Sequence, residues 1–294
     1  MDADPNKSGP GGGEALAPYV GGRSFVGAQR VRLGDVSPHG WARLDALARY
    51  LQDVANDDAY DSGIDNPGVW VVRRSTIEVY RRPTLREDLT LRTFCSGTGA
   101  CWAERRTSVT GSGGAHLEAA VLWVQLDSDG TRPARLGPDF AAVYGESAAG
   151  RKVRANLTLD QYPPAGPTST FPLRRTDLDV MGHVNNAVYW GMLEEVVSGE
   201  LVGEPLPGVL AGGNASPTSP ASPAPTSPYQ PVRFDLEHHQ PIDPGANVQL
   251  HRSGRRLWIT AAGALAAVAA WSPPAGQEIG ALTGPQAPIE PEHS

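Results

Sequence analysis

A short segment in the second half of this chain holds residue types that could act on a carbonyl group. Asp179 and His183 lie four residues apart, Gly182 permits a sharp bend just before the histidine, and Asn185 and Asn186 follow at the start of an apolar run. Either asparagine can cap a helix that begins there. A carboxylate, an imidazole and a carboxamide would therefore meet at the positive N-terminal end of a buried helix. That end suits a carbonyl oxygen that gains negative charge.

Each part of this pattern also has a purely structural explanation. An Asp-x-x-x-His pair is common, and an asparagine before a helix is usually only a cap. The complete string DLDVMGHVNNAVYWGMLEE, residues 177–195, is far more specific. It resembles the active-site segment of thioesterases with the hot-dog fold, in which an aspartate, a Gly-His pair and a VNN-x-x-Y run lead into the central helix.

The elements that must position this segment form two similar halves. In the first, a strand over 24–33 precedes a helix near 43–60, whose apolar residues recur at helical spacing. In the second, a strand over 170–174 precedes a helix over 186–201. Further strands complete each antiparallel set, at 69–79, 89–95, 102–109 and 117–126 in the first half and at 231–238, 246–252 and 256–271 in the second.

Two further similarities support an internal repeat. Asp35 and His39 have the spacing of Asp179 and His183 and also precede a helix. The stretch Tyr80-Arg-Arg-Pro83 is echoed by His238-His-Gln-Pro241. We therefore predict that the first half is a degenerate copy of the second and that Asp35 corresponds to Asp179.

Composition bounds the class of protein. With 294 residues, of which 40% are hydrophobic, the chain can bury a sizeable core, and its net charge of −7 argues against a general nucleic-acid binder. No apolar run is long enough to span a bilayer and the N-terminus does not look like a signal peptide, so we expect a cytoplasmic protein. Cys95 and Cys101 have no other candidate metal ligands at a suitable spacing. We therefore expect reduced thiols, no metal site and no cofactor.

Segments rich in proline, glycine and serine mark the expected boundaries. We predict a disordered tail over 1–22, a low-complexity insertion over 203–228 and a loose tail over 273–294. The two domains would then span 23–147 and 148–272. The connection between them has a middle part that could form a short surface helix.

The first half points to a narrower family. LARYLQDVA, followed by VWVVRRSTIEVYRRPTLREDLTLRTF, resembles the N-terminal hot dog of acyl-acyl-carrier-protein (acyl-ACP) thioesterases. The likeness covers most of residues 24–126 and 170–271. It implies an α+β fold of two tandem hot-dog domains, each an antiparallel sheet wrapped around a long central helix. It also implies a hydrolase acting on a fatty acyl thioester of acyl carrier protein. The assembly is left open, with a homodimer as one alternative.

In that family the second hot dog carries the chemistry. The resemblance places the family's acid at Asp179 and its histidine at His183, with the VNN-x-x-Y run at 184–189. Met181 departs from it, because the plant-type enzymes have asparagine there. His239 departs as well, since it stands where those enzymes have an acidic residue on the next strand.

Thioester hydrolysis suggests a role for each candidate. Asp179 would be the general base or nucleophile, and His183 would orient the thioester or protonate the leaving thiolate. Asn185 would supply the missing carboxamide. His239 would orient the water, or is an ordinary sheet-surface histidine. The backbone N–H groups around Gly182 and Val184 would hold the oxyanion.

In the same family the first hot dog holds the acyl chain. We expect Tyr50, Val54 and Trp70 to line that pocket, because such sites are apolar clefts with few polar groups. Arginines in the segments 73–74, 81–82 and 151–154 could dock the acidic carrier, although solvated charges explain them equally well. The alternatives to an acyl-ACP thioesterase are an acyl-CoA thioesterase and a non-catalytic acyl-binding protein. A dehydratase would need its own His/acid motif, which we do not find.

Overall fold

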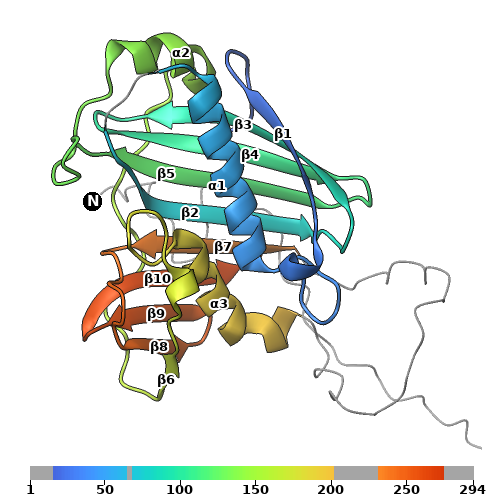
Figure 1. Ribbon diagram of the computed structural model, residues 1–294, viewed down its shortest axis with the longest axis vertical. Coiled ribbons are helices and arrows are strands. Elements are labelled where there is room, and N and C mark those ends of the chain that lie inside the picture. Colours follow the sequence, from blue (N-terminus) through green and yellow to red (C-terminus); the bar gives the residue numbers. More distant parts are fainter. Residues whose placement is uncertain (1–15, 65–67, 202–230, 275–294) are drawn as a thin grey trace, which may run out of the picture.

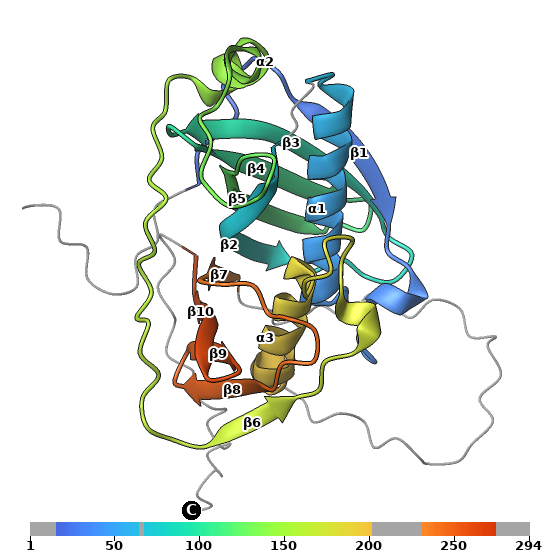
Figure 2. The same ribbon diagram turned by 60° about the vertical axis from the view of Figure 1, so that its left-hand side comes forward.

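The computed structural model describes residues 16–64, 68–201 and 231–274. Its strands form one continuous antiparallel sheet in the order β1-β3-β4-β5-β2-β7-β10-β9-β8-β6, with α1 and α3 on the same face (Figures 1 and 2). The helices are α1 (Leu44–Asp61), α2 (Pro138–Ala148) and α3 (Asn186–Leu201), with short 3-10 turns at Leu33–Asp35 and Arg175–Asp177. The strands are β1 (Phe25–Arg30), β2 (Trp70–Arg81), β3 (Asp88–Thr98), β4 (Trp102–Gly111), β5 (His116–Gln125), β6 (Thr168–Phe171), β7 (Val232–His238), β8 (Val248–Ser253), β9 (Arg256–Ala261) and β10 (Ala264–Ser272).

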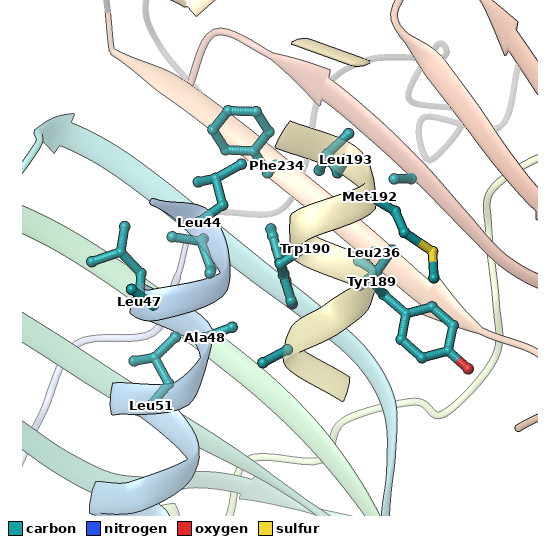
Figure 3. Close-up of a cluster of buried hydrophobic side chains, with 14 of the residues drawn as sticks. Leu44, Leu47, Ala48, Leu51, Tyr189, Trp190, Met192, Leu193, Phe234 and Leu236 are labelled. Atoms are coloured by element: carbon teal, nitrogen blue, oxygen red, sulfur yellow. The ribbon is translucent and has the colours of Figure 1, made fainter. Parts of the chain in front are cut away.

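The core lies where α1 and α3 pack against each other and against the sheet. The two helices run antiparallel, so that Leu44 of α1 lies near Leu193 of α3, while Leu51 lies toward the Trp190 end (Figure 3). Phe234 on β7 belongs to the same cluster, on the side of the sheet, and is fully buried. Because α3 is apolar nearly all round, it can contact α1 and the sheet at once.

The predicted pair of sheets is in fact one sheet. β2 and β7 pair edge to edge, with Ser75 opposite Leu236 and Ile77 opposite Phe234. Most inward-facing residues on both strands are apolar, among them Ile77, Phe234 and Leu236, so the pairing buries them beneath the two helices. Each helix therefore sits in its own half of a shared sheet.

Two predicted strands are wrong in detail. The single strand predicted over 256–271 is the hairpin β9–β10, which turns at Ala262 and Gly263, both in the left-handed backbone region. Alanine rarely adopts that conformation, so the apolar run hides the turn. The strand predicted over 170–174 is β6, which lies at Thr168–Phe171 and ends before Leu173.

The turns that precede α1 and α3 share their main backbone hydrogen bonds. Each begins with an aspartate, Asp35 or Asp177, that closes a capping box with an arginine three residues earlier. The backbone carbonyl of Asp35 accepts from the N–H of Arg43, and that of Asp177 accepts from the N–H of Asn185. Corresponding residues in this region are therefore numbered 142 apart, as are the first residues of the two helices.

The connection between the halves crosses the outer face of the sheet. After α2 it runs down past β3, β2 and β7 to β6 (Figure 2). Along this path the carboxylate of Glu237 accepts hydrogen bonds from the backbone N–H groups of Thr158 and Leu159. Trp258 donates from its ring N–H to the carbonyl of Asp160 over 2.7 Å. Glu237 therefore points away from α3.

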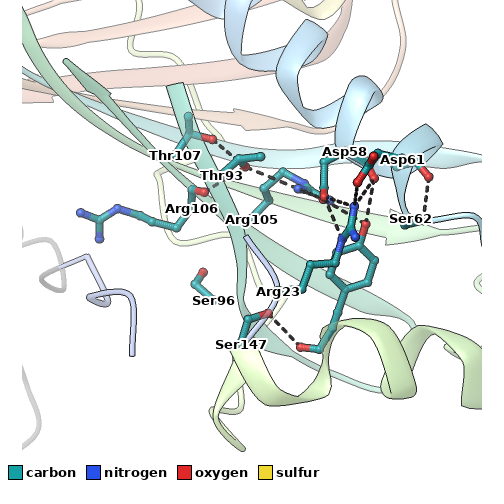
Figure 4. A network of polar contacts seen from close by, with 12 residues as sticks. Arg23, Asp58, Asp61, Ser62, Thr93, Ser96, Arg105, Arg106, Thr107 and Ser147 are labelled. Carbon is teal, nitrogen blue, oxygen red and sulfur yellow. Dashed lines mark hydrogen bonds and ion pairs between the residues drawn. The ribbon is translucent and has the colours of Figure 1, made fainter. Parts of the chain in front are cut away.

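A buried polar network joins the far end of α1 to its neighbours (Figure 4). The carboxylate of Asp58, which is 1% exposed, accepts from Arg23, Arg105 and the hydroxyl of Tyr144. These partners come from the N-terminal segment, β4 and α2. The predicted surface helix α2 is thus held by a buried charge and is partly enclosed.

Other sequence-based expectations concern the ends of the chain and the cysteines. Ala17, within the predicted tail, accepts a hydrogen bond from Arg106, and Tyr19 packs edge-on against Phe94. Both cysteines are free, as predicted. Among the described residues, no helix combines the length and apolar character needed to cross a membrane. The predicted insertion and most of both predicted tails lie outside the described residues.

Candidate active site

The loop that enters α3 is a tight turn built on Asp179. Its carboxylate oxygen Oδ1 accepts from the backbone N–H of Met181 at 2.9 Å and of His183 at 3.3 Å, while its backbone N–H donates to the carbonyl of His183 at 2.9 Å. Gly182 closes the turn with a φ of 77°, a conformation that favours glycine. Asp179 is half-buried and His183 is exposed, so the turn presents the imidazole at the rim.

The three backbone amides predicted to hold an oxyanion are already engaged. The N–H of Gly182 donates to the carbonyl of Asp179, that of His183 to the carboxylate of Asp179, and that of Val184 to the carbonyl of Ile242. Their partners hold the turn in shape. Among the described contacts, the amide of Asn186, the first residue of α3, has no hydrogen-bond partner.

Asn185 is the cap of α3. Its Oδ1 accepts from the backbone N–H of Ala187 over 2.8 Å, as expected for an N-cap asparagine. Of the two asparagines that could cap the helix, Asn185 is therefore the one that does so. A direct catalytic role stays a prediction, and it would have to use the free N–H bonds of the same carboxamide.

Tyr189, one turn into α3, links Asp179 to a histidine that sequence reasoning missed. Its phenol lies near Asp179 and bonds to the backbone of Ile242, and burial raises its pKa. On its other side, the ring meets the imidazole of His238 edge-on, with centroids 4.8 Å apart. Tyr189 therefore contacts the imidazole of His238 and lies within electrostatic range of the carboxylate of Asp179.

His238 is a buried, neutral imidazole. Its Nε2 has no hydrogen-bond partner in the described part of the chain. Burial, with smaller contributions from the nearby His239 and Arg73, lowers the pKa of His238 to about 4. The alternation of β7 could have revealed it, because Phe234 and Leu236 point inward and His238 is the next inward position.

His239 follows the end of β7. Its Nε2 is also buried and unpaired among the residues described, and burial together with Arg73 lowers its pKa. The predicted equivalence of Tyr80 with His238 is off by one. Since the carbonyls of Pro83 and Ile242 accept equivalent bonds, from Ala42 and Val184, Tyr80 corresponds to His239. His238 therefore corresponds to Val79, a fully buried core position.

The first half has no counterpart of the Asp179–His183 pair. By the hydrogen bonds of the turn, Asp35 corresponds to Asp177, not to Asp179 as the spacing suggested. Ser37 takes the place of Asp179, because its N–H bonds to the carbonyl of Trp41 as that of Asp179 bonds to His183. The remaining positions follow: His39 matches Met181, Trp41 matches His183, and Arg43 matches Asn185.

A large cavity lies in the first half, between α1, the sheet and α2. Its volume is about 310 Å³, near the lower end of ordinary ligand pockets. α1 turns Gln52, Ala55, Asn56 and Ala59 toward it, and the two alanines leave the space unfilled. Trp70, one of the residues predicted to line an acyl pocket, lines this cavity beside Phe140 of α2.

Tyr50 and Val54 do not line this cavity. The hydroxyl of Tyr50 donates to Asp35 over 2.7 Å, and Val54 packs against the backbone of Gly27 on β1. Both face the other side of α1, because residues 50 and 54 lie on a different helical stripe from residues 52, 55, 56 and 59.

The arginines predicted to dock a carrier are largely used within the molecule. Arg73 donates to the carbonyl of His238, Arg82 pairs with Glu194, and Arg151 pairs with Glu104. Arg81 and Arg154 are exposed. No set of three or more histidine, cysteine, aspartate or glutamate side chains in the described ranges is grouped to hold a metal ion.

Several known proteins are similar to this chain in sequence. An uncharacterized protein of Mycobacterium tuberculosis is 30% identical over 177 residues, which is 60% of this chain and 71% of that protein. The chloroplastic oleoyl-acyl carrier protein thioesterase 1 of Arabidopsis thaliana is 26% identical over 198 residues, 58% of this chain and 54% of that protein.

Two solved structures match over nearly their whole length. The 12:0-ACP thioesterase from Umbellularia californica has a TM-score of 0.61 at 18% identity and covers 86% of this chain and 99% of its own. An acyl-ACP thioesterase from Bacteroides thetaiotaomicron has a TM-score of 0.63 at 15% identity, and the match covers 85% of this chain and 98% of that one. These likenesses confirm the double hot-dog fold.

Two family models match separate parts of the chain. The N-terminal domain of acyl-ACP thioesterases matches residues 22–144, and the C-terminal domain of the same family matches residues 164–207. The second match contains the complete turn from Asp179 to His183 and the start of α3. The chain belongs to the acyl-ACP thioesterase family.

Proposed function

We propose that this protein hydrolyses a fatty acyl thioester of acyl carrier protein to the free fatty acid and the carrier thiol. The observation that carries the proposal is the Asp179–His183 pair in the turn at the N-terminal end of α3, because the equivalent turn of the first half has Ser37 and Trp41 at these positions. A non-catalytic second half would not need to keep an aspartate and a histidine that the first half does not have.

The residues of the turn can divide the reaction between them. Asp179 Oδ2 accepts none of the hydrogen bonds found within the described residues, so it is the oxygen available for the reaction. It would take a proton from the water that attacks the carbonyl carbon, or would attack that carbon itself and form an anhydride that water then hydrolyses to the fatty acid. In either case the carbon–sulfur bond breaks, and His183 at the rim would protonate the leaving thiolate. The first amide of α3 lies where negative charge on the carbonyl oxygen is stabilised.

The carrier is proposed from the family and its named relatives. The fold alone does not separate acyl carrier protein from coenzyme A. Most of the arginines that we expected to dock a carrier serve internal contacts, so exposed Arg81 and Arg154 are the ones left for this role.

A second candidate, a non-catalytic acyl-binding protein, is favoured by two departures from the family pattern. Met181 and His239 stand where the plant-type enzymes have an asparagine and an acid. Neither side chain can replace the lost group directly, since a thioether is a weak acceptor and the imidazole of His239 is unpaired.

Thiol release by the purified full chain tests the proposal. Acyl-ACP and acyl-CoA thioesters of matched chain length are compared at several lengths. We expect turnover with acyl-ACP to exceed turnover with acyl-CoA. Faster hydrolysis of the acyl-CoA substrates would assign coenzyme A, not acyl carrier protein, as the carrier of the acyl group. Binding of either substrate without turnover would favour the non-catalytic alternative.

A further inference from the structure

The repeat places Gln52 of α1 opposite a functional position of α3. Gln52 is the ninth residue of α1, and Glu194 is the ninth residue of α3, 142 positions later. Glu194 contacts Leu44, the first residue of α1, and Gln52 lines a cavity together with Asn186, the first residue of α3. What Glu194 contacts therefore indicates what Gln52 faces.

Glu194 occupies the N-terminal end of α1. Its Oε2 accepts from the backbone N–H of Leu44, the first residue of that helix, and its Oε1 accepts from Arg82 over 3.0 Å. In the first half, therefore, a carboxylate already fills the place where a helix N-terminus would bind an oxyanion.

The second half differs at each of these positions. Gln52 is uncharged, and the counterpart of Arg82 is Pro241, so neither the carboxylate nor its cation is present. Gln52 and Asn186, the counterpart of Leu44, instead line a common cavity of about 20 Å³. Ser75, only 6% exposed, lines it too, and its hydroxyl makes none of the hydrogen bonds found in the described chain.

Gln52 also lines the 310 Å³ cavity of the first half, as does Trp123. The large cavity and the small one therefore adjoin at these two side chains. An acyl chain in the large cavity would pass Gln52 before its first carbon reached the start of α3. A carboxamide placed there can donate two hydrogen bonds to a carbonyl oxygen without repelling it.

We propose that Gln52, supplied by the first half, binds the thioester carbonyl at the N-terminal end of α3. This inference rests on the proposed function, since it names a substrate contact of the same site. Glutamine keeps the place open for an oxygen of the substrate, whereas glutamate at the equivalent position of the other half closes it.

A pair of unreactive ligands isolates this contact. The first is an acyl-pantetheine analogue with a methylene in place of sulfur, which keeps the carbonyl as a ketone. The second has a methylene in place of that carbonyl as well. Calorimetry on the full chain gives the ratio of the two affinities. A lost carbonyl hydrogen bond corresponds to about tenfold.

We expect the wild-type protein to prefer the ketone by about tenfold and Gln52→Leu to lose that preference. Asn56→Leu makes the same chemical change one turn along α1, where only the large cavity is lined, and should keep the preference. Gln52→Glu should bind the ketone worse than Gln52→Leu does, because its carboxylate can occupy the N–H of Asn186. Thermal melting of each variant shows whether it is folded.

Several results would overturn the inference. They are equal binding of both analogues by the wild type, no binding of either, a preference that survives Gln52→Leu, or a preference lost equally in Asn56→Leu. None of these depends on turnover. A chain that binds as expected but hydrolyses no thioester would refute the proposed function and leave the role of Gln52 standing.

Discussion

The carboxylate of Glu194, on α3, accepts a hydrogen bond from the backbone N–H of Leu44, the first residue of α1. The same carboxylate pairs with Arg82, whose side chain is 4% exposed. α1 and α3 otherwise meet through apolar side chains, which permit several relative positions. This one polar contact fixes the start of α1 against the middle of α3 and so sets how the halves are aligned.

We predict that Glu194→Ala destabilises the protein by about 3 kcal/mol, because it leaves Arg82 as an uncompensated buried charge and removes the acceptor for Leu44. Urea denaturation followed by tryptophan fluorescence measures the change. Glu195→Ala, at the next and exposed position, is the control and should change the free energy of unfolding by less than about 0.5 kcal/mol. Equal effects of the two substitutions would contradict the assigned role.

The catalytic prediction concerns the turn before α3. Asp179→Asn and His183→Ala should each lower the rate of thiol release by at least about a hundredfold, which is the scale of a lost acid–base group. Asp179→Asn keeps an oxygen for the amides of Met181 and His183, so the turn should stay formed. The rates are measured at saturating acyl-ACP with melting temperatures recorded alongside.

Ser37 provides the matched control, because it takes the place of Asp179 in the first half. Its buried Oγ has no hydrogen-bond partner among the residues described, so Ser37→Ala should leave both the rate and the melting temperature unchanged. If Ser37→Ala slows hydrolysis as much as Asp179→Asn does, the reaction takes place in the other half.

The elements that local sequence determines were predicted closely. α3 was predicted over 186–201 and lies there, and α1 begins one residue after its predicted start. Both helices have a regular apolar pattern and a clear beginning, which are local signals. The pairing of β2 with β7 and the turn at Ala262 depend on distant contacts or on an unusual backbone conformation, and no local pattern reveals them.

In the candidate site, residue spacing alone could not identify which positions of the two halves correspond. Asp35 has the spacing to His39 that Asp179 has to His183, but hydrogen bonds show that it matches Asp177. The second half has an aspartate at both positions, so spacing alone could not tell which one the first half had kept. Similarly, the helical pattern placed Val54 in the core without showing which stripe of α1 faced the cavity.

The next prediction concerns the residues of α1 that line the 310 Å³ cavity, among them Ala55. Ala55→Leu should lower the rate with the longest acyl chains that the protein accepts and shift the preference to shorter ones, because the added atoms enter the 310 Å³ cavity. Relative kcat/KM over a series of chain lengths measures the shift. Asp57→Leu, on the exposed side of α1, should leave the profile unchanged. An identical profile in Ala55→Leu would mean that the acyl chain binds elsewhere.

The last prediction concerns His238, the imidazole at a core position. Its pKa is about 4 in the folded protein, because burial disfavours the charged form, and about 6.5 in the unfolded chain. Between these values the unfolded chain binds a proton that the folded protein does not. Stability should therefore fall as pH drops from about 6.5 toward 4, by about 2 kcal/mol at pH 5.

His238→Val tests this directly, since valine is the residue at the equivalent position of the first half, Val79. Other titrating groups are common to both proteins, so the difference between their unfolding free energies isolates the imidazole. We expect the variant to gain about 2 kcal/mol on the wild type between pH 8 and pH 5. Parallel pH curves would show that His238 is not held neutral. A drop in thiol release at pH 8, with stability retained, would instead assign the imidazole to the reaction, through its contact with Tyr189 beside Asp179.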